Sequence, residues 1–191
     1  MRTALALITP PVVEPVSLVD AKSHLRVDIA DDDMLISSLI TTAREYCESF
    51  QGRAYVSQAL ALILDGFPSG AEIVLPRPPL RSVERVVYTT AAGVTTTWPS
   101  TNYIVDTASR PGRLLLAPGA TWPAGPFMPM GVDVEYTAGY GVSAAQVPAR
   151  VKQAILLLIG DWYERREATA APSAAAQAAE ALLWQDRMLP I

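Results

Sequence analysis

The sequence predicts an α+β fold: a small helical bundle, with two N-terminal and two C-terminal helices, carrying an inserted antiparallel β-sheet or small barrel. Three observations support this fold class. Apolar residues recur at three- and four-residue steps near both ends of the chain. The middle is rich in Val, Thr, Tyr, Pro and Gly and alternates between apolar and polar residues. No helical pattern separates the predicted strands, which argues against parallel βαβ units.

These patterns divide the chain into five parts. Residues 1–16 are expected to form an extended arm because three prolines follow a short apolar stretch; a frayed terminus is the alternative. Residues 17–54 and 147–188 are expected to form the helical domain. Residues 55–141 form the β insertion, and residues 189–191 a C-terminal tail.

Capping residues locate the two N-terminal helices. Ser17 is a candidate N-cap for a helix from Leu18 to about Arg26. The aspartates at 31–33 open a second helix, where carboxylates favour the positive end of the helix dipole, and Gly52 ends it. The apolar stripe of this second helix includes Leu35, Leu39, Ala43, Tyr46 or Cys47, and Phe50.

The predicted insertion contains about six strands, separated by turns rich in Gly and Pro. They centre on residues 60–64, 72–75, 82–88, 103–106, 113–116 and 132–137.

The clearest helical pattern follows Pro148, whose fixed φ suits a first helical turn. Val151, Ile155, Leu158 and Trp162 form its stripe, and charged residues end it. Such a broad stripe fits either a helix packed against a neighbouring subunit or a small core helix. The last helix, Ala174 to Met188, is rich in alanine and needs a packing partner.

Composition narrows the class of protein. Half of the 191 residues are hydrophobic and 18% are charged, which disfavours disorder. The net charge of −4 disfavours a generic nucleic-acid binder. Cys47 is the single cysteine, so the chain has no internal disulfide, and a reducing cytoplasm fits best. No apolar run approaches the roughly 20 residues of a membrane span.

The titratable residues do not suggest an enzyme, a cofactor site or a metal site. His24 is the only histidine, and Cys47 falls on a helix stripe as a small core residue. The acidic cluster at residues 28–33 lacks the spacing of a calcium loop. Gly139 and Gly141 belong to a strand-to-helix turn without a phosphate-loop motif. The arginines at 77, 81, 85, 110 and 113 fit a solvated sheet face better than a phosphate site.

Several large apolar residues are candidates for a subunit or partner interface. The Pro- and Gly-rich loop over residues 118–130 either folds back over the β core or exposes a patch that another chain covers. Helix faces and the end of the last helix supply the other candidates. The full set is Leu35, Leu39, Ile155, Leu158, Trp162, Trp122, Phe127, Met128, Trp184 and Met188.

Several short motifs occur in an order that resembles the head–tail connector proteins, which are also called head-completion or adaptor proteins. These proteins occur in tailed bacteriophages and in phage-like gene transfer particles. The opening of the chain carries the first of these motifs, and the Pro-rich turn at residues 75–80 and the Tyr-Gly hinge at 136–141 resemble the longer members with a β insertion. The motifs are Ala21-Lys22-Ser23-His24-Leu25-Arg26-Val27, the aspartates 31–33, Leu35-Ile36, Leu39-Ile40, Ala43-Arg44, Gly52-Arg53-Ala54, and Val147-Pro148 leading to Tyr163-Glu164-Arg165-Arg166.

This resemblance implies a structural role without a cofactor. Such proteins form a ring, usually of twelve subunits, beneath the portal protein; the ring extends the channel for double-stranded DNA and docks a stopper or tail-completion protein. The implied location is the neck of the virion, with assembly in the host cytoplasm. The subunit is expected to form a dodecamer in the particle and to be a monomer when free.

Three other functions compete with this one. A stopper, neck or tail-completion protein of the same particle is the nearest, but stoppers tend towards all-β barrels, and the helices favour an adaptor. A small hydrolase would use His24 with Asp28 or Asp31. A DNA-binding regulator would need a basic recognition helix, and Arg150 with Lys152 supplies too little charge.

Overall fold

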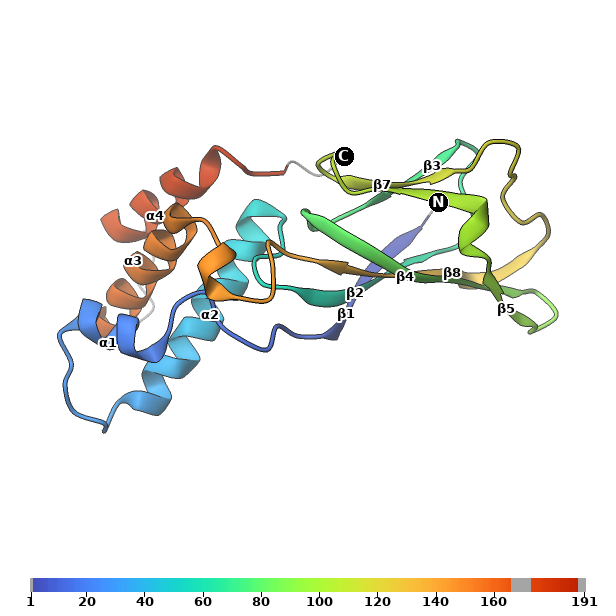
Figure 1. Cartoon of the computed structure of the whole chain (residues 1–191). Helices are drawn as coiled ribbons and strands as arrows, with labels where there is room; N and C mark the ends of the chain where they lie inside the picture. The colour runs from blue at the N-terminus through green and yellow to red at the C-terminus, as the bar shows by residue number, and fades with distance from the viewer. Residues whose placement is uncertain (1, 166–172, 189–191) are drawn as a thin grey trace. The chain divides into compact units, whose positions relative to one another are not determined.

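The computed structural model describes residues 2–165 and 173–188 and contains two compact units (Figure 1). The β unit comprises Met1–Pro11 and Ser57–Gly139. The helical unit comprises Val12–Val56 and Tyr140–Ile191. The prediction of an α+β chain with four helices is confirmed.

Two antiparallel sheets make up the β unit. The larger sheet has the order β1-β2-β8-β4-β5, and the smaller has the order β3-β7-β6. In the described part of the chain neither sheet closes on itself, so the alternative of a small barrel is wrong. The strands are β1 (Thr3–Thr9), β2 (Gln58–Leu64), β3 (Glu72–Leu75), β4 (Leu80–Thr90), β5 (Thr95–Trp98), β6 (Tyr103–Asp106), β7 (Gly112–Leu116) and β8 (Phe127–Ala138).

The core of the β unit follows from strand alternation, since every second residue points to the same face of a sheet. Leu62 of β2, Val134 of β8 and Val86 of β4 lie in register across the larger sheet and are buried. A Cβ on Gly112 of β7 would lie only 2.4 Å from the Cβ of Leu80. Glycine therefore lets β7 approach this end of β4.

Two strands differ from the sequence analysis. Residues 3–9 were expected in an extended arm, but they form β1 and pair with β2. The alternating Thr-Ala-Leu-Ala-Leu-Ile-Thr segment can pair because the prolines begin only at Pro10. Strand β5 was not predicted, because its three threonines and one tryptophan show no clear apolar alternation.

The described part of the helical unit contains four α-helices: α1 (Leu18–Leu25), α2 (Asp33–Gln51), α3 (Ala149–Arg165) and α4 (Ala174–Trp184). The Ser17 side chain caps α1 by accepting from the Asp20 N–H at 3.1 Å. Gly52 ends α2 in the left-handed region at φ 66°, which glycine adopts without a steric penalty. Helix α4 ends at Trp184, before the expected Met188. No described helix is long and apolar enough to cross a bilayer.

Helix α3 packs against each of the other three helices. Its buried residues include Val151, Ala154, Ile155, Leu158 and Ile159. They meet Ile36, Ile40 and Ala43 of α2 and Leu183 of α4 in one apolar core. The broad stripe on α3 is therefore the inner face of this unit.

Candidate functional site

Of the two residues considered for catalysis, Cys47 lies in the core and His24 lies beside a groove. Cys47 is fully buried, and burial together with the charge of Glu48 raises its pKa to about 12, so the thiolate that a nucleophile needs is disfavoured. His24 lies on α1 beside an open groove of about 340 Å³ that Asp20 and Lys152 also line. No group of three or more His, Cys, Asp or Glu side chains converges on a metal position within residues 2–165 and 173–188.

The aspartates at the start of α2 hold the fold together. Asp33 accepts a hydrogen bond from Lys22 at 2.6 Å, which joins α2 to α1. Asp32 accepts from the Tyr163 hydroxyl at 2.5 Å, which joins α2 to α3. Both contacts agree with a structural role for the acidic cluster.

Two of the sheet arginines form ion pairs with carboxylates. Arg85 pairs with Glu135 at 2.5 Å, and Arg113 pairs with Asp106 at 2.9 Å. Hydrogen bonds from Ser109 and Arg113 hold the pKa of Asp106 far below its ordinary value. These pairs fit a solvated sheet face, because their positive charge is already neutralised.

Two of the expected interface residues lie in the core of their own unit. Ile155 and Leu158 are 0% and 1% exposed, so their side chains are not available at the surface of the single chain. The stripe that could have faced a neighbour is covered within the same chain by α2 and α4. Leu39 also packs against this core, whereas Leu35 is half-exposed.

Of the candidate residues in the loop over residues 118–130, some fold back over the β core and one is exposed. Trp122 stacks on Phe67 with ring centroids 5.3 Å apart, and Phe127 meets the same ring at 5.5 Å. The Trp122 indole N–H also donates to the Gly70 carbonyl at 2.6 Å. These two residues therefore fold back over the β unit, while Met128 stays exposed.

The remaining candidates meet in an aromatic patch on the helical unit, which we define as Tyr46, Phe50, Trp162, Trp184 and Arg187. Tyr46 lies between Phe50 and Trp162, with centroid distances of 6.4 and 6.1 Å. Phe50 lies 6.3 Å from Trp184, and the Arg187 guanidinium is 4.7 and 5.0 Å from these two rings. Trp184 is 61% exposed. Clustered Trp, Tyr and Arg side chains are typical of protein interfaces.

The aromatic patch contains residues that the sequence analysis did not select. Tyr46 and Phe50 were counted only as helix stripe, although their four-residue spacing on α2 was a signal that they share a face. Arg187 carried no signal, because its position depends on the turn that follows α4. Met188 lies beside the patch, and its N–H donates to the Gln51 carbonyl at 2.8 Å.

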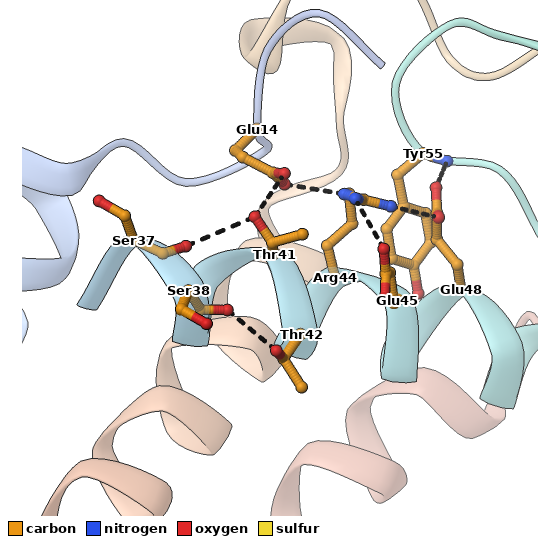
Figure 2. A network of polar contacts seen from close by, with 9 residues as sticks. All are labelled: Glu14, Ser37, Ser38, Thr41, Thr42, Arg44, Glu45, Glu48 and Tyr55. Carbon is orange, nitrogen blue, oxygen red and sulfur yellow. Dashed lines mark hydrogen bonds and ion pairs between the residues drawn. The ribbon is translucent and has the colours of Figure 1, made fainter. Parts of the chain in front are cut away.

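A buried polar network, shown in Figure 2, also escaped the sequence analysis. Arg44 of α2 donates to Glu14 at 2.8 Å and to Glu48 at 2.9 Å. Glu48 in turn accepts from the Tyr55 backbone N–H at 2.7 Å. Burial alone would lower the pKa of Arg44, but the bonds and charges of Glu14 and Glu48 outweigh it and raise the pKa.

This network attaches two segments of the chain to α2, one that precedes α1 and one that follows α2. Glu14 lies in the segment before α1, and Tyr55 follows α2. Thr41 adds a hydrogen bond to Glu14 at 3.0 Å. In the sequence, the four-residue spacing of Arg44 and Glu48 was the only sign of this polar network. Every charged member has a partner here, so the network stabilises the unit and offers no free reactive group.

The comparisons with known proteins agree with a structural rather than a chemical site. Residues 15–89 match the family model described as phage gp6-like head-tail connector protein. Comparison with curated proteins finds no match.

Solved structures match the chain over almost its whole length. A chain from the neck of an empty gene transfer agent (GTA) particle, computed with C6 symmetry, is 26% identical and has a TM-score of 0.81, covering 98% of this chain and 97% of that one. A chain from the virion of the native GTA particle is 26% identical with a TM-score of 0.79, covering 98% and 96%. A chain from the native GTA neck, computed with C12 symmetry, is 25% identical with a TM-score of 0.78, covering 100% and 97%.

These matches confirm the resemblance that the sequence motifs suggested. The chain carries the signature of the gp6-like head–tail connector family in residues 15–89 and, from end to end, the fold of a subunit found in the neck of a phage-like particle.

Proposed function

We propose that this chain is a structural adaptor of a phage or phage-like particle, without enzymatic activity. It docks as a ring beneath the portal protein, extends the channel for double-stranded DNA and provides the surface on which a stopper or tail-completion protein docks. It acts in the neck of the virion and assembles in the host cytoplasm.

The observation that carries this proposal is the likeness to neck chains of particles computed with C6 and C12 symmetry, which covers nearly all of both chains. Copies related by such rotation meet through two different faces of the subunit. A ring of twelve copies follows for this chain if it assembles as those necks do. A stopper of the same particle is the alternative, but the four helices and the open sheets favour an adaptor.

Binding to the portal would drive ring closure. A free monomer that docks on a portal meets neighbouring docked copies at high effective concentration. The net charge of −4 lets DNA slide past, because few counterions are released on contact. The aromatic patch is the surface proposed to meet the portal or stopper, with Trp184 as its most exposed ring.

Electron microscopy and sedimentation of the purified protein, alone and with its cognate portal, test this function. We expect monomers alone and annular complexes with the portal. Monodisperse monomers under both conditions would refute the adaptor role.

Replacing Trp184 tests the aromatic patch separately. Trp184→Ala is expected to weaken portal binding about thirtyfold, since interface aromatics contribute about 2 kcal/mol each. Val19→Ala is the control, because Val19 is an exposed apolar residue outside the patch. Equal binding by both variants would exclude the patch from the portal contact.

A further inference from the structure

The larger sheet ends in two strands, β1 and β5, whose outer edges pair with no other strand in the described residues. We propose that β1 of one copy pairs in parallel with β5 of the next copy, so that the sheet continues from subunit to subunit around the ring. This inference rests on the proposed ring and identifies its two complementary faces.

From Thr3 to Leu7, strand β1 lacks the devices that normally protect an open sheet edge; its one irregularity is a register shift between Leu7 and Thr9. Proteins block such edges with charged residues, prolines or bulges, because an open flat strand binds other strands. Residues 3–9 contain no charge, proline or glycine. Leu5 and Leu7 are 40% and 54% exposed although they are large and apolar. The edge is therefore suited to being covered in the assembled protein.

Strand β5, at the opposite end of the sheet, is shorter, with four residues, but it too contains no charge or proline. Thr95, Thr96 and Thr97 are exposed, uncharged and β-branched, a residue type that favours strands. One sheet thus offers two different unprotected edges, which is what a head-to-tail interface requires.

The directions of the strands select parallel pairing. Four antiparallel pairings lead from β1 through β2, β8 and β4 to β5, so β1 and β5 run the same way. Extending the sheet by rotation to the next copy places β5 and the incoming β1 parallel. A two-fold contact between two β1 strands would instead be antiparallel and would give a closed dimer.

The hydrogen bonds at the start of β1 show which backbone groups face outward. The Asp65 N–H donates to the Arg2 carbonyl at 3.3 Å, so Arg2 directs its backbone towards β2. Successive residues of a strand direct their backbone groups to opposite sides. Ala4 and Ala6 therefore bond to β2, and Thr3, Leu5 and Leu7 present free N–H and C=O groups at the edge.

Side-chain faces also agree across the proposed junction. The register connects Leu5 to Leu62, Val134, Val86 and finally Trp98. These residues occupy the apolar face of the sheet, whose inner members are buried. Pairing β1 with β5 of the next copy would bring Leu5 and Leu7 beside Trp98 and Thr96, and the apolar face would continue between subunits.

A proline at Leu5 tests the backbone pairing. Leu5→Pro removes an outward N–H that β2 does not use, and proline is tolerated on edge strands in this orientation. Leu5→Ala is the matched control, because it removes the same side chain and keeps the N–H. We expect at least about fivefold less portal-bound ring for Leu5→Pro than for Leu5→Ala at equal protein concentration.

Circular dichroism and the unfolding midpoint establish whether Leu5→Pro remains folded. Equal ring formation by two folded variants would overturn the inference. Portal-bound single copies that fail to close a ring would support it and leave portal docking intact, whereas loss of docking in the wild type would refute the proposed function itself.

Cross-linking supplies a test that does not depend on the proline variant. Leu5 and Thr96 lie on the same face, so the double variant Leu5→Cys with Thr96→Cys should give a ladder of linked chains when a short bis-maleimide is added to the portal-bound protein. Each single variant should give no cross-linked chains, since Cys47 is buried with a raised pKa and does not react. Dimers from Leu5→Cys alone would indicate a two-fold β1 contact and refute the proposal.

Discussion

At the scale of single residues, the most consequential feature is the ion pair between Arg44 and Glu48. Both side chains are nearly inaccessible, at 5% and 7% exposure. A buried charge is tolerated only when its partners are present, and removing one partner leaves the other uncompensated. Arg44 has a second partner in Glu14, and Glu48 has a second donor in the Tyr55 N–H.

Glu48→Gln is expected to lower the free energy of unfolding by about 3 kcal/mol, because the amide places an N–H donor group against the Arg44 guanidinium. Urea unfolding followed by circular dichroism measures this loss. Glu14→Gln is the control: Glu14 is 29% exposed, so water can replace part of its bond and the loss should be smaller. Equal losses for the two variants would contradict the special role of the buried pair.

At the scale of elements, the contact of α4 with α2 determines whether the aromatic patch exists. The Tyr46 hydroxyl of α2 donates to Glu180 of α4 at 2.5 Å. This bond, together with burial and the Glu180 charge, raises the pKa of Tyr46 to about 12. Because the ordinary tyrosine pKa is about 10, the bond stabilises the fold fully below pH 10, and this contribution disappears as the pH rises from about 10 to 12.

Tyr46→Phe keeps the ring and removes only this hydrogen bond. We expect faster amide hydrogen exchange in residues 174–184 at neutral pH, with little change in α1, because the bond joins α4 to α2. The difference in stability between wild type and variant should be constant from pH 7 to 9 and shrink above pH 10. A difference that grows above pH 10 would show that the hydroxyl does not donate to Glu180.

The helices and strands also show which structural features the sequence patterns can predict. The bounds of α1 and α2 were predictable because Ser17, the aspartates at 31–33 and Gly52 act locally on the backbone. Strand β1 was missed because its partner β2 is distant in the sequence. Strand β5 pairs locally with β4 and was missed because its residues show no clear apolar alternation. For α3, periodicity located the apolar face but could not identify what covers it. The aromatic patch was only partly predictable, because the position of Arg187 depends on tertiary packing.

At the scale of the whole molecule, the chain passes from the helical unit into the β unit after Val56 and returns at Tyr140. The segment that leaves the helical unit and the segment that returns to it lie side by side within that unit. The Tyr140 N–H donates to the Tyr55 carbonyl at 2.9 Å, and Val56 forms a parallel bridge with Gly141. The apolar core of the helical unit contains only residues of that unit.

Deleting residues 1–11 and replacing residues 57–139 by a linker of about four residues should therefore leave a folded helical unit, since a short loop closes this gap at small entropic cost. We expect a helical circular dichroism spectrum and a cooperative urea transition. The same replacement combined with Ile155→Asp is the control; it should abolish the transition, because a charge would enter the core. A non-cooperative transition for the shortened chain itself would mean that the helical unit needs the β unit to fold. Cooperative unfolding would instead make the β unit an insertion that can be removed, so that binding of the shortened chain to the portal shows which unit docks.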